Sequence, residues 1–385
     1  MARQDKHSRP RGRTGKRAGA AGSSGRARLA KRAAKPKPAA KAKPKAKPKA
    51  KPKAKPQAGA KAAARSKDRG AKTGRKPVEP RRGPGVVPRT AAGPRLKLRG
   101  RVLENELLAR HTTWRIGGPA RFLAQPADAE DVERAVAFAR EQGLPWTVLG
   151  LGSNVLVKDS GFAGVVIRMG KGPDRFEMKG ATAVVGAGLP IPLLARRTAE
   201  TGFVGVERFI GIPGSVGGGV YMNAGCHGAE FAEVVTEASV LDASGKVRTL
   251  SRKQIPYTYR ASNLGHVVVL EAKLGLGEES PAKLKEIQGR LLRWRKAGTP
   301  FDQACAGSTF RNPGGPKTAG MLIDECGLKG YREGAAQVST MHANYFVNTG
   351  TATAADVLRL IDHVRKTVRK RTGVELALEI KVIGT

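Results

Sequence analysis

The stretch Gly211-Ile-Pro-Gly-Ser-Val-Gly-Gly-Gly-Val-Tyr-Met-Asn-Ala-Gly225 contains six glycines in fifteen residues. Glycines at this density leave the backbone without Cβ cover, so its N–H groups can closely approach an anionic or planar ligand. A glycine-rich turn between strands would have the same composition, because glycine clusters commonly punctuate structure. The stretch therefore predicts either a ligand-cradling loop or a simple turn, and its neighbours decide between them.

A second glycine turn precedes it in the chain, as Gly150-Leu-Gly-Ser-Asn154. It follows a predicted strand at Trp146–Leu149 and comes before another at Val165–Met169. A strand, a glycine turn and a second strand can cradle a phosphate, although a tight turn alone would explain the pattern equally well. Two such loops in one mixed α/β chain favour a ligand site more than either loop alone.

The basic charge of the chain is concentrated at its N-terminus. Among 385 residues, 71 are Lys or Arg and 31 are Asp or Glu, a net charge of +40. Residues 1–100 hold 34 of the basic residues and only three of the acids, and an Ala-Lys-Pro-Lys repeat runs from Lys41 to Pro56. Like charges, prolines and few large apolar residues predict a disordered tail over residues 1–95. Such a tail would bind nucleic acid or another polyanion through counterion release, or would serve as a solvated linker without a specific partner.

Cysteine usage and hydropathy indicate the compartment. Cys226, Cys305 and Cys326 form no CxxC pair and have no metal-type spacing with histidine, which fits a reducing environment and no metal site. The basic N-terminus is not followed by the apolar core of a signal peptide, and no run is long enough for a membrane span. We expect a soluble, cytoplasmic protein without membrane insertion.

The ordered part of the chain is predicted to begin near Leu96 and to mix helices with strands. Asp128 is placed to cap a helix that extends to Gln142 and ends at Gly143. Helical periodicity and strand composition predict further elements. The helices are Pro192–Thr201, Pro281–Lys296, Ala319–Cys326 and Ala354–Thr372, and the strands are Ala183–Val185, Val234–Leu241, Val267–Leu274, Ala336–Ser339, Tyr345–Asn348 and Leu376–Ile383.

Several common enzyme motifs are absent. Gly150-Leu-Gly152 is followed by Ser-Asn-Val, so the Rossmann pattern Gly-x-Gly-x-x-Gly fails at its last position. The chain also lacks a Gly-Lys-Ser/Thr phosphate loop, Gly-x-Ser-x-Gly and His-Glu-x-x-His. A Rossmann dinucleotide site, an NTPase and the usual hydrolases and metalloproteases all lose support.

Three downstream motifs complete an ordered series with the two glycine loops. They are Tyr259-Arg-Ala-Ser262, Gly307-Ser-Thr-Phe-Arg-Asn-Pro313 and Leu378-Glu-Ile380. Together they resemble the UDP-N-acetylenolpyruvoylglucosamine reductase family over roughly Leu107 to the C-terminus. The resemblance implies NADPH-dependent, FAD-mediated reduction of the enolpyruvyl sugar nucleotide to UDP-N-acetylmuramate, for peptidoglycan precursor synthesis. The short Ser262–Val267 connection resembles type II members.

The resemblance also implies an α+β fold. An FAD-binding, two-lobed domain of the vanillyl-alcohol-oxidase/PCMH type is expected over residues 96–297, and a smaller α/β substrate-binding domain over residues 298–385. The last strand is expected to return to the FAD site. Two alternatives remain open from the residues: a nucleic-acid-binding protein driven by its tail, and a flavin oxidase of the same superfamily.

The resemblance assigns roles to individual residues. Arg260 and Glu379 would polarise the enolpyruvyl group, and Ser308 would donate the proton. Lys296 and Asn312 would contact the UDP-sugar substrate. FAD would be bound by residues of the two glycine loops, namely Gly150, Gly152, Ser153, Asn154, Gly214, Ser215, Gly218, Asn223 and Gly225. At the exit of the second loop this chain has Cys226-His227 where the family commonly has Ala-Tyr.

Overall fold

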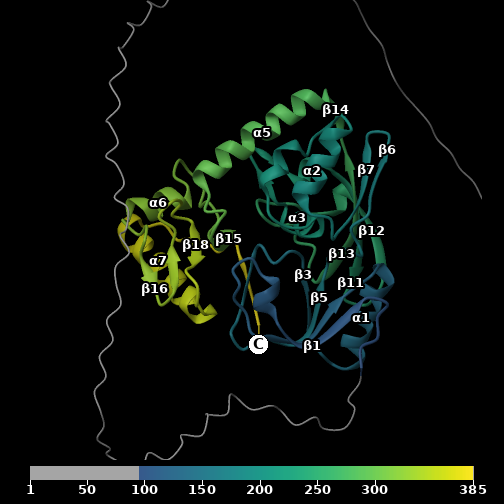
Figure 1. The fold of residues 1–385 in the computed structure, drawn as a ribbon, viewed down its shortest axis with the longest axis horizontal. Coiled ribbons are helices and arrows are strands. Elements are labelled where there is room, and N and C mark those ends of the chain that lie inside the picture. The colour runs from purple at the N-terminus through teal and green to yellow at the C-terminus, as the bar shows by residue number, and fades with distance from the viewer. Residues whose placement is uncertain (1–94, 385) are drawn as a thin grey trace, which may run out of the picture. The chain divides into compact units, whose positions relative to one another are not determined.

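The computed structural model describes residues 95–384, and these form an α+β fold with three main sheets (Figure 1). The expected fold class is confirmed for this part of the chain. The predicted disordered, polyanion-binding tail of residues 1–95 lies almost wholly outside the described residues. No helix within residues 95–384 is long and apolar enough to cross a bilayer.

The first sheet has the strand order β1-β2-β5-β3. Strands β2, β5 and β3 run parallel, and β1 pairs with β2 antiparallel. Helix α1 connects β2 to β3, as a parallel crossover requires. The bounds are β1 Arg101–Leu107, β2 Pro119–Gln125, α1 Ala129–Glu141, β3 Trp146–Leu149 and β5 Phe162–Arg168.

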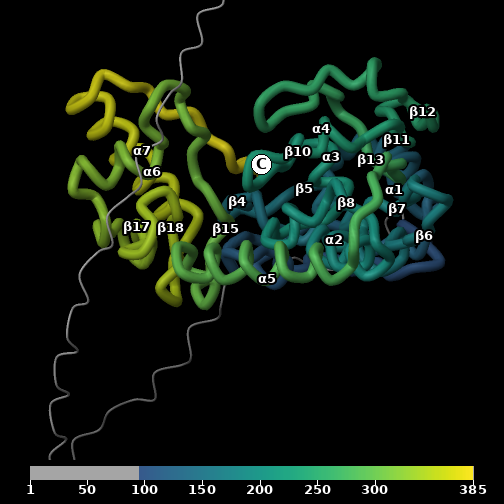
Figure 2. The backbone as a smooth tube through the Cα atoms, turned by 90° about the horizontal axis from the view of Figure 1, so that it is seen from above, coloured from purple at the N-terminus to yellow at the C-terminus, as the bar shows by residue number. Residues whose placement is uncertain are grey.

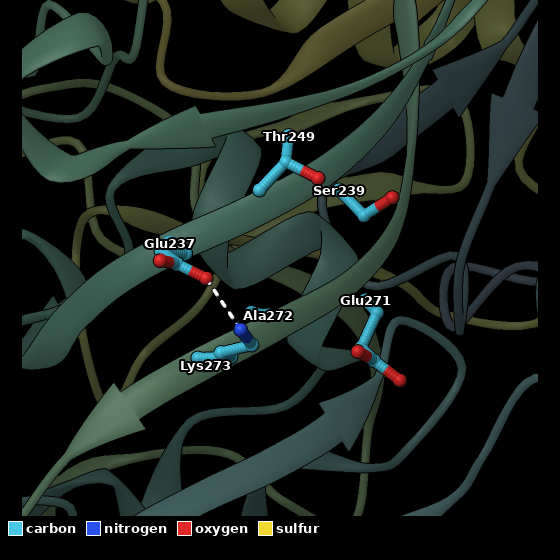
Figure 3. Close-up of a pocket in the computed structure, with 6 residues that line it drawn as sticks. All are labelled: Glu237, Ser239, Thr249, Glu271, Ala272 and Lys273. Carbon is cyan, nitrogen blue, oxygen red and sulfur yellow. Dashed lines mark ion pairs between the residues drawn. The ribbon is translucent and has the colours of Figure 1, made fainter.

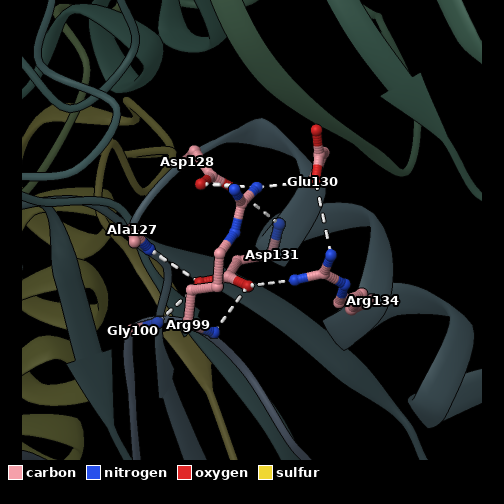
Figure 4. Close-up of polar contacts among 7 residues, drawn as sticks. All are labelled: Arg99, Gly100, Ala127, Asp128, Glu130, Asp131 and Arg134. Atoms are coloured by element: carbon pink, nitrogen blue, oxygen red, sulfur yellow. Dashed lines mark hydrogen bonds and ion pairs between the residues drawn. The ribbon is translucent and has the colours of Figure 1, made fainter.

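A buried carboxylate fixes the start of α1 (Figure 4). Asp128 caps the helix as predicted, with Oδ1 accepting a hydrogen bond from the Asp131 backbone N–H at 3.0 Å. Asp131 itself is fully buried and accepts from the backbone N–H groups of Arg99, Gly100 and Ala127 at 2.7–3.0 Å. Arg134 adds an ion pair at 3.0 Å. The chain entering β1 is thereby tied to the first turn of α1.

The second sheet is antiparallel, with the order β12-β11-β13-β7-β6. Helices α2, α3 and α5 belong to this part of the chain, and Figure 2 shows α5 running past α2 toward the C-terminal elements. The bounds are β6 Phe176–Lys179, β7 Thr182–Gly186, α2 Ile191–Glu200, α3 Val216–Met222, β11 Val235–Asp242, β12 Val247–Ser251, β13 Val267–Gly275 and α5 Pro281–Gly298.

A polar hollow lies on β11, β12 and β13 (Figure 3). Its carboxylates already have partners: Glu237 is paired with Lys273 at 2.6 Å, and Glu271 lies 3.9 Å from Arg175. None of its lining residues belongs to a sequence motif discussed above. We regard the hollow as a solvated sheet face.

The C-terminal sheet has the order β15-β18-β17-β16 and packs with helices α6 and α7 around a separate apolar core. Thr353 and Asp356 form the predicted capping box at the start of α7. Trp114, from the segment between β1 and β2, is buried in this same core and donates from Nε1 to the Phe346 carbonyl at 2.8 Å. The bounds are β15 Ala304–Ser308, α6 Ala319–Glu325, β16 Arg332–Glu333, β17 Ala336–Val338, β18 Tyr345–Asn348 and α7 Ala354–Thr372.

Two expectations about local structure need correction. The final strand, β19, spans only Lys381–Ile383 and pairs in parallel with β4 (Val155–Val157), so Glu379 lies just before it. The glycine stretch 211–225 is a loop only in part, because Val216–Met222 forms helix α3 with Ser215 as its N-cap. The polar cap and the packing of Val216 and Val220 outweigh the poor helix propensity of three consecutive glycines.

Short elements connect these units. They are the 3-10 turns Leu108–His111, Glu207–Gly211 and Arg252–Gln254, the helical turn α4 Phe231–Val234, and the strand pairs β8 Phe203–Val204 with β14 Gly277–Glu278 and β9 Gly225–Cys226 with β10 Ala229–Glu230.

Candidate active site

The two glycine loops meet in space. The Ser153 hydroxyl donates to the Pro213 carbonyl at 2.9 Å, which joins the first loop directly to the second. A Cβ built on Gly150 would collide with the Ser215 hydroxyl, so a side chain there would displace the N-cap of α3. Gly152, with φ +68°, is pressed against the backbone of His111. Four of the predicted cofactor residues are thus in one neighbourhood.

The first loop presents backbone donors that the protein does not use. Within the described part of the chain, no hydrogen bond engages the backbone N–H groups of residues 150–154. Gly152 is buried, so water does not readily replace a partner there. In the second loop, the N–H groups of Gly214 and Ser215 are likewise without a partner among residues 95–384. Unpaired N–H groups in two adjoining glycine loops suit an anionic ligand such as the pyrophosphate of FAD.

The predicted cofactor residues at the far end of the second loop have structural roles. Asn223 is buried at the C-terminus of α3 with φ +47°. Its Nδ2 donates to the Thr258 carbonyl at 3.0 Å, and its Oδ1 accepts from the Ala232 N–H at 2.9 Å. Gly225 lies against Arg260. This end of the loop therefore holds the Tyr259–Ser262 turn in place.

Arg260 and Glu379 come together from segments 119 positions apart. Arg260 Nε lies 3.4 Å from Glu379 Oε1. Its Nη2 donates to the Gly225 carbonyl at 2.8 Å, and its Nη1 lies 3.5 Å from the Asn223 carbonyl. The Arg260 backbone is left-handed, with φ +56°, which is uncommon for a residue with a side chain. The glycine loop thus aims the guanidinium at the carboxyl group.

The carboxyl group of Glu379 is in an unusual electrostatic position. Burial raises its pKa above the ordinary value, and the nearby guanidinium groups of Arg260 and Arg311 only partly offset this effect. The Asn154 side chain donates to the Glu379 backbone carbonyl at 3.2 Å, so the first glycine loop also positions this residue. Perturbed carboxyl groups with a specific charged partner are typical of functional sites.

Ser308 lies close by along the backbone. It ends β15 opposite Tyr345, after a bulge in which Gly307 has φ +70°. The next residue, Thr309, accepts from the Glu379 backbone N–H at 2.9 Å, and Phe310 forms a bridge with Leu378. No hydrogen bond among residues 95–384 uses the half-buried Ser308 hydroxyl. The three predicted catalytic residues are therefore brought to one place.

The two predicted substrate contacts are less central. Lys296 is exposed near the C-terminus of α5 and forms no ion pair within the described residues. Asn312 Oδ1 accepts from the Ala319 N–H at 3.1 Å, which supports the start of α6. Their roles toward a substrate stay predictions.

Sequence reasoning missed two arginines. Arg295, next to Lys296, packs against Gly211 and donates from Nη1 to Cys226 Sγ at 3.1 Å. Arg311 donates from Nη2 toward the Arg260 carbonyl at 3.4 Å. Arg311 lies inside the Gly-Ser-Thr-Phe-Arg-Asn-Pro motif, so its proximity to Ser308 was visible in the sequence. For Arg295 no comparable signal exists.

The unusual loop exit is also explained in part. Cys226 receives the Arg295 hydrogen bond, and His227 contacts the ring of Trp294 edge-on, with ring centroids 5.2 Å apart. Burial, together with the charges of Arg295 and Arg208, lowers the pKa of His227. The Cys-His pair therefore anchors the end of α5 to the glycine loop.

The paired glycine loops and the half-buried arginine–glutamate pair define a flavoprotein-type site, and comparison with known families agrees. Residues 120–251 match the model of an FAD binding domain, and residues 299–383 match that of the C-terminal domain of UDP-N-acetylenolpyruvoylglucosamine reductase. The chain belongs to the UDP-N-acetylenolpyruvoylglucosamine reductase family.

Individual relatives support this assignment along nearly their whole length. The reductase of Halalkalibacterium halodurans is 43% identical over 287 residues, which is 74% of this chain and 95% of the relative. That of Bacillus subtilis is 43% identical over 288 residues, with the same coverage. The crystal structure of the Thermus caldophilus reductase is 36% identical, has a TM-score of 0.64, and covers 75% of this chain and 100% of its own.

Proposed function

We propose that Arg260, Glu379 and Ser308 are the catalytic residues of an FAD-dependent UDP-N-acetylenolpyruvoylglucosamine reductase. The family assignment makes the chain an FAD-dependent oxidoreductase that uses NADPH in peptidoglycan synthesis. No observation favours the flavin oxidase or the nucleic-acid-binding alternative. The observation that carries the residue assignment is the convergence of the Arg260–Glu379 pair with the Ser308 strand beside both glycine loops.

The glycine loops would hold the cofactor. The free N–H groups of residues 150–154, with those of Gly214 and Ser215, would bind the pyrophosphate. Gly218 is the one exposed residue of α3 and leaves the helix backbone there without side-chain cover. Hydride transfer from NADPH to the methylene carbon of the enolpyruvyl group is the chemistry that FAD supplies when bound.

The polar residues would act on the substrate. Negative charge develops on the enolpyruvyl carboxylate when hydride arrives, and a guanidinium held by two carbonyl groups stabilises that charge without reorganising. A carboxyl group with a raised pKa, such as Glu379, can share a proton with the developing enolate. The unengaged Ser308 hydroxyl would deliver the proton to the adjacent carbon.

The half-reactions separate these roles. We expect the purified protein to carry FAD, to be reduced by NADPH, and to be reoxidised by the enolpyruvyl sugar nucleotide. Ser308→Ala should keep the first half-reaction and lose about two to three orders of magnitude in the second, measured by stopped-flow flavin absorbance. A variant that loses flavin reduction instead would contradict the proton-donor role.

Ser339→Ala is a matched control, because Ser339 is a buried serine of the same region whose hydroxyl accepts from the Met341 backbone N–H. It should leave both half-reactions near wild-type rates. Four further proposals stand beside this one. Lys296 and Asn312 would contact the substrate, and residues 298–385 would form a C-terminal domain. The protein would lie in the cytoplasm, and its N-terminal residues would bind a polyanion.

A further inference from the structure

Arg311 occupies a position that none of the roles above uses. Its backbone N–H donates to the Ala377 carbonyl at 2.9 Å, in the antiparallel bridge where Phe310 pairs with Leu378. This bridge sets the Arg311 side chain beside the segment that carries Glu379. The contact is made by main-chain atoms, so it would be kept when the side chain at position 311 is replaced.

The Arg311 guanidinium reaches the backbone of Arg260. Nη2 lies 3.4 Å from the Arg260 carbonyl oxygen. Arg260 is left-handed, with φ +56°, and a residue with a side chain holds that conformation only when its surroundings favour it. A donor on the carbonyl of Arg260 is one such constraint, and the Thr258–Ala261 bridge and the side-chain hydrogen bond to Gly225 are others.

Arg311 also acts on Glu379 through its charge. Among the described residues, the charged groups facing the Glu379 carboxyl group are Arg260, at 3.4 Å, and Arg311. Arg311 forms no ion pair with a carboxylate within residues 95–384, and its buried Nε has no hydrogen-bond partner there. An unneutralised cation in a poorly solvated place exerts a stronger field than one at the surface.

We propose that Arg311 is a positioning residue, which holds Arg260 in its left-handed conformation and provides the second positive charge beside Glu379. The inference rests on the proposed roles of Arg260 and Glu379. It assigns Arg311 no contact with the reacting atoms. Its two effects are separable, because one needs the forked guanidinium and the other needs only a positive charge.

The experiment compares Arg311→Gln with Arg311→Lys in the FAD-loaded, full-length protein. Arg311→Gln should reduce kcat for the substrate half-reaction roughly ten- to a hundredfold, as expected for a misplaced catalytic group, with little change in NADPH-driven flavin reduction. We expect kcat of the substrate half-reaction to fall with pH as Glu379 ionises, and Glu379→Gln to abolish this limb of the profile. In Arg311→Gln the limb should move to higher pH, by about half a unit or more, because a charge that lowers the pKa of Glu379 has been removed.

Arg311→Lys retains the positive charge and loses the planar, forked guanidinium group that contacts the Arg260 carbonyl. We expect its pH limb to stay at the wild-type position while kcat falls several-fold. Arg290→Gln is the matched control, because Arg290 is an exposed arginine on α5 and should leave both measurements unchanged.

An unmoved limb in Arg311→Gln, or a shifted limb in Arg311→Lys, would overturn the inference. Should Arg311→Gln fail to retain FAD, Arg311→Lys decides alone: wild-type kcat would refute the positioning role, and a reduced kcat with an unshifted limb would support it. A wild-type protein without enolpyruvyl turnover would contradict the proposed function itself, which keeps the two failures distinct.

Discussion

The Asp131 carboxylate is wholly withdrawn from solvent and that of Glu379 only partly, and their environments are opposite. Asp131 is fully buried beneath three backbone N–H donors and Arg134. Burial by itself would raise its pKa, but the hydrogen bonds from Ala127, Arg99 and Gly100 more than offset this, and the pKa is lowered. Glu379 has one ion pair at 3.4 Å, and its pKa is raised.

The difference separates a carboxylate that stabilises the fold from one that is available for chemistry. Three backbone donors and Arg134 together engage both oxygens of the Asp131 carboxylate, so it has no capacity left for a ligand. The Glu379 carboxyl group keeps oxygen lone pairs free and a proton affinity closer to neutral pH. The predictions below test this contrast, beginning with the largest effect.

Glu379→Gln should cost two to three orders of magnitude in kcat, about 2.7–4 kcal/mol of transition-state stabilisation, because the amide cannot share a proton. Flavin content should stay near the wild-type value and Tm should not fall, since Arg260 keeps its carbonyl acceptors. Stopped-flow kinetics and differential scanning fluorimetry check the two parts.

The exposed and surface-paired Glu375 provides the control, and Glu375→Gln should affect neither measurement. A Glu379→Gln variant that turns over normally would place the catalytic carboxyl group elsewhere.

Asp131→Asn should destabilise the protein by about 3 kcal/mol, because an amide nitrogen would then face backbone donors and leave some of them unsatisfied. Activity per bound FAD should be unchanged, as Asp131 touches no residue of the candidate site. Urea unfolding followed by intrinsic fluorescence measures the loss, with exposed Glu130→Gln as the control. A marked fall in activity per flavin would contradict the purely structural role.

The two carboxylates should give stability opposite dependences on pH. The lowered pKa of Asp131 contributes stability that is present above its unfolded pKa of about 3.9 and is lost as pH falls through the folded value. The raised pKa of Glu379 contributes stability below its unfolded pKa of about 4.3, which is lost as pH rises through the folded value.

Asp131→Asn should therefore flatten the acid side of the stability curve, and Glu379→Gln should remove a decline on the neutral side. Neither slope can exceed about 1.4 kcal/mol per pH unit. Urea titrations from about pH 2 to 8 cover both windows, and equal slopes in the two variants would refute the contrast.

The smallest effect is expected at the helix cap beside Asp131. Asp128→Ala removes the hydrogen bond to the Asp131 backbone N–H and should cost about 1 kcal/mol, the usual value for an N-cap. The loss should be smaller than that of Asp131→Asn when both are measured by the same urea titration. A larger loss of stability in Asp128→Ala than in Asp131→Asn would mean that the helix cap contributes more to this part of the fold than the buried carboxylate does.

Much of the fold was predictable because its signals are local. Helical spacing, Asp128 and the Thr353 capping box located α1 and α7 to within a residue or two. The glycine loops and the three downstream motifs were sufficient to recognise the family and its FAD. Local signals failed where tertiary packing prevailed, as in the glycine-rich helix α3 and the shortened strand β19.

The sequence by itself determined which residue types were available for chemistry, together with their order along the chain. Only the tertiary structure decided that the Ser153 hydroxyl donates to the second loop and that glycine-loop carbonyl groups hold Arg260. The same is true of the contact between the Arg311 guanidinium and the Arg260 carbonyl. Those contacts join distant segments, and no local propensity encodes them. The glycine stretch 211–225 thus supplies, through the Asn223 and Gly225 carbonyl groups, the acceptors that hold the Arg260 guanidinium.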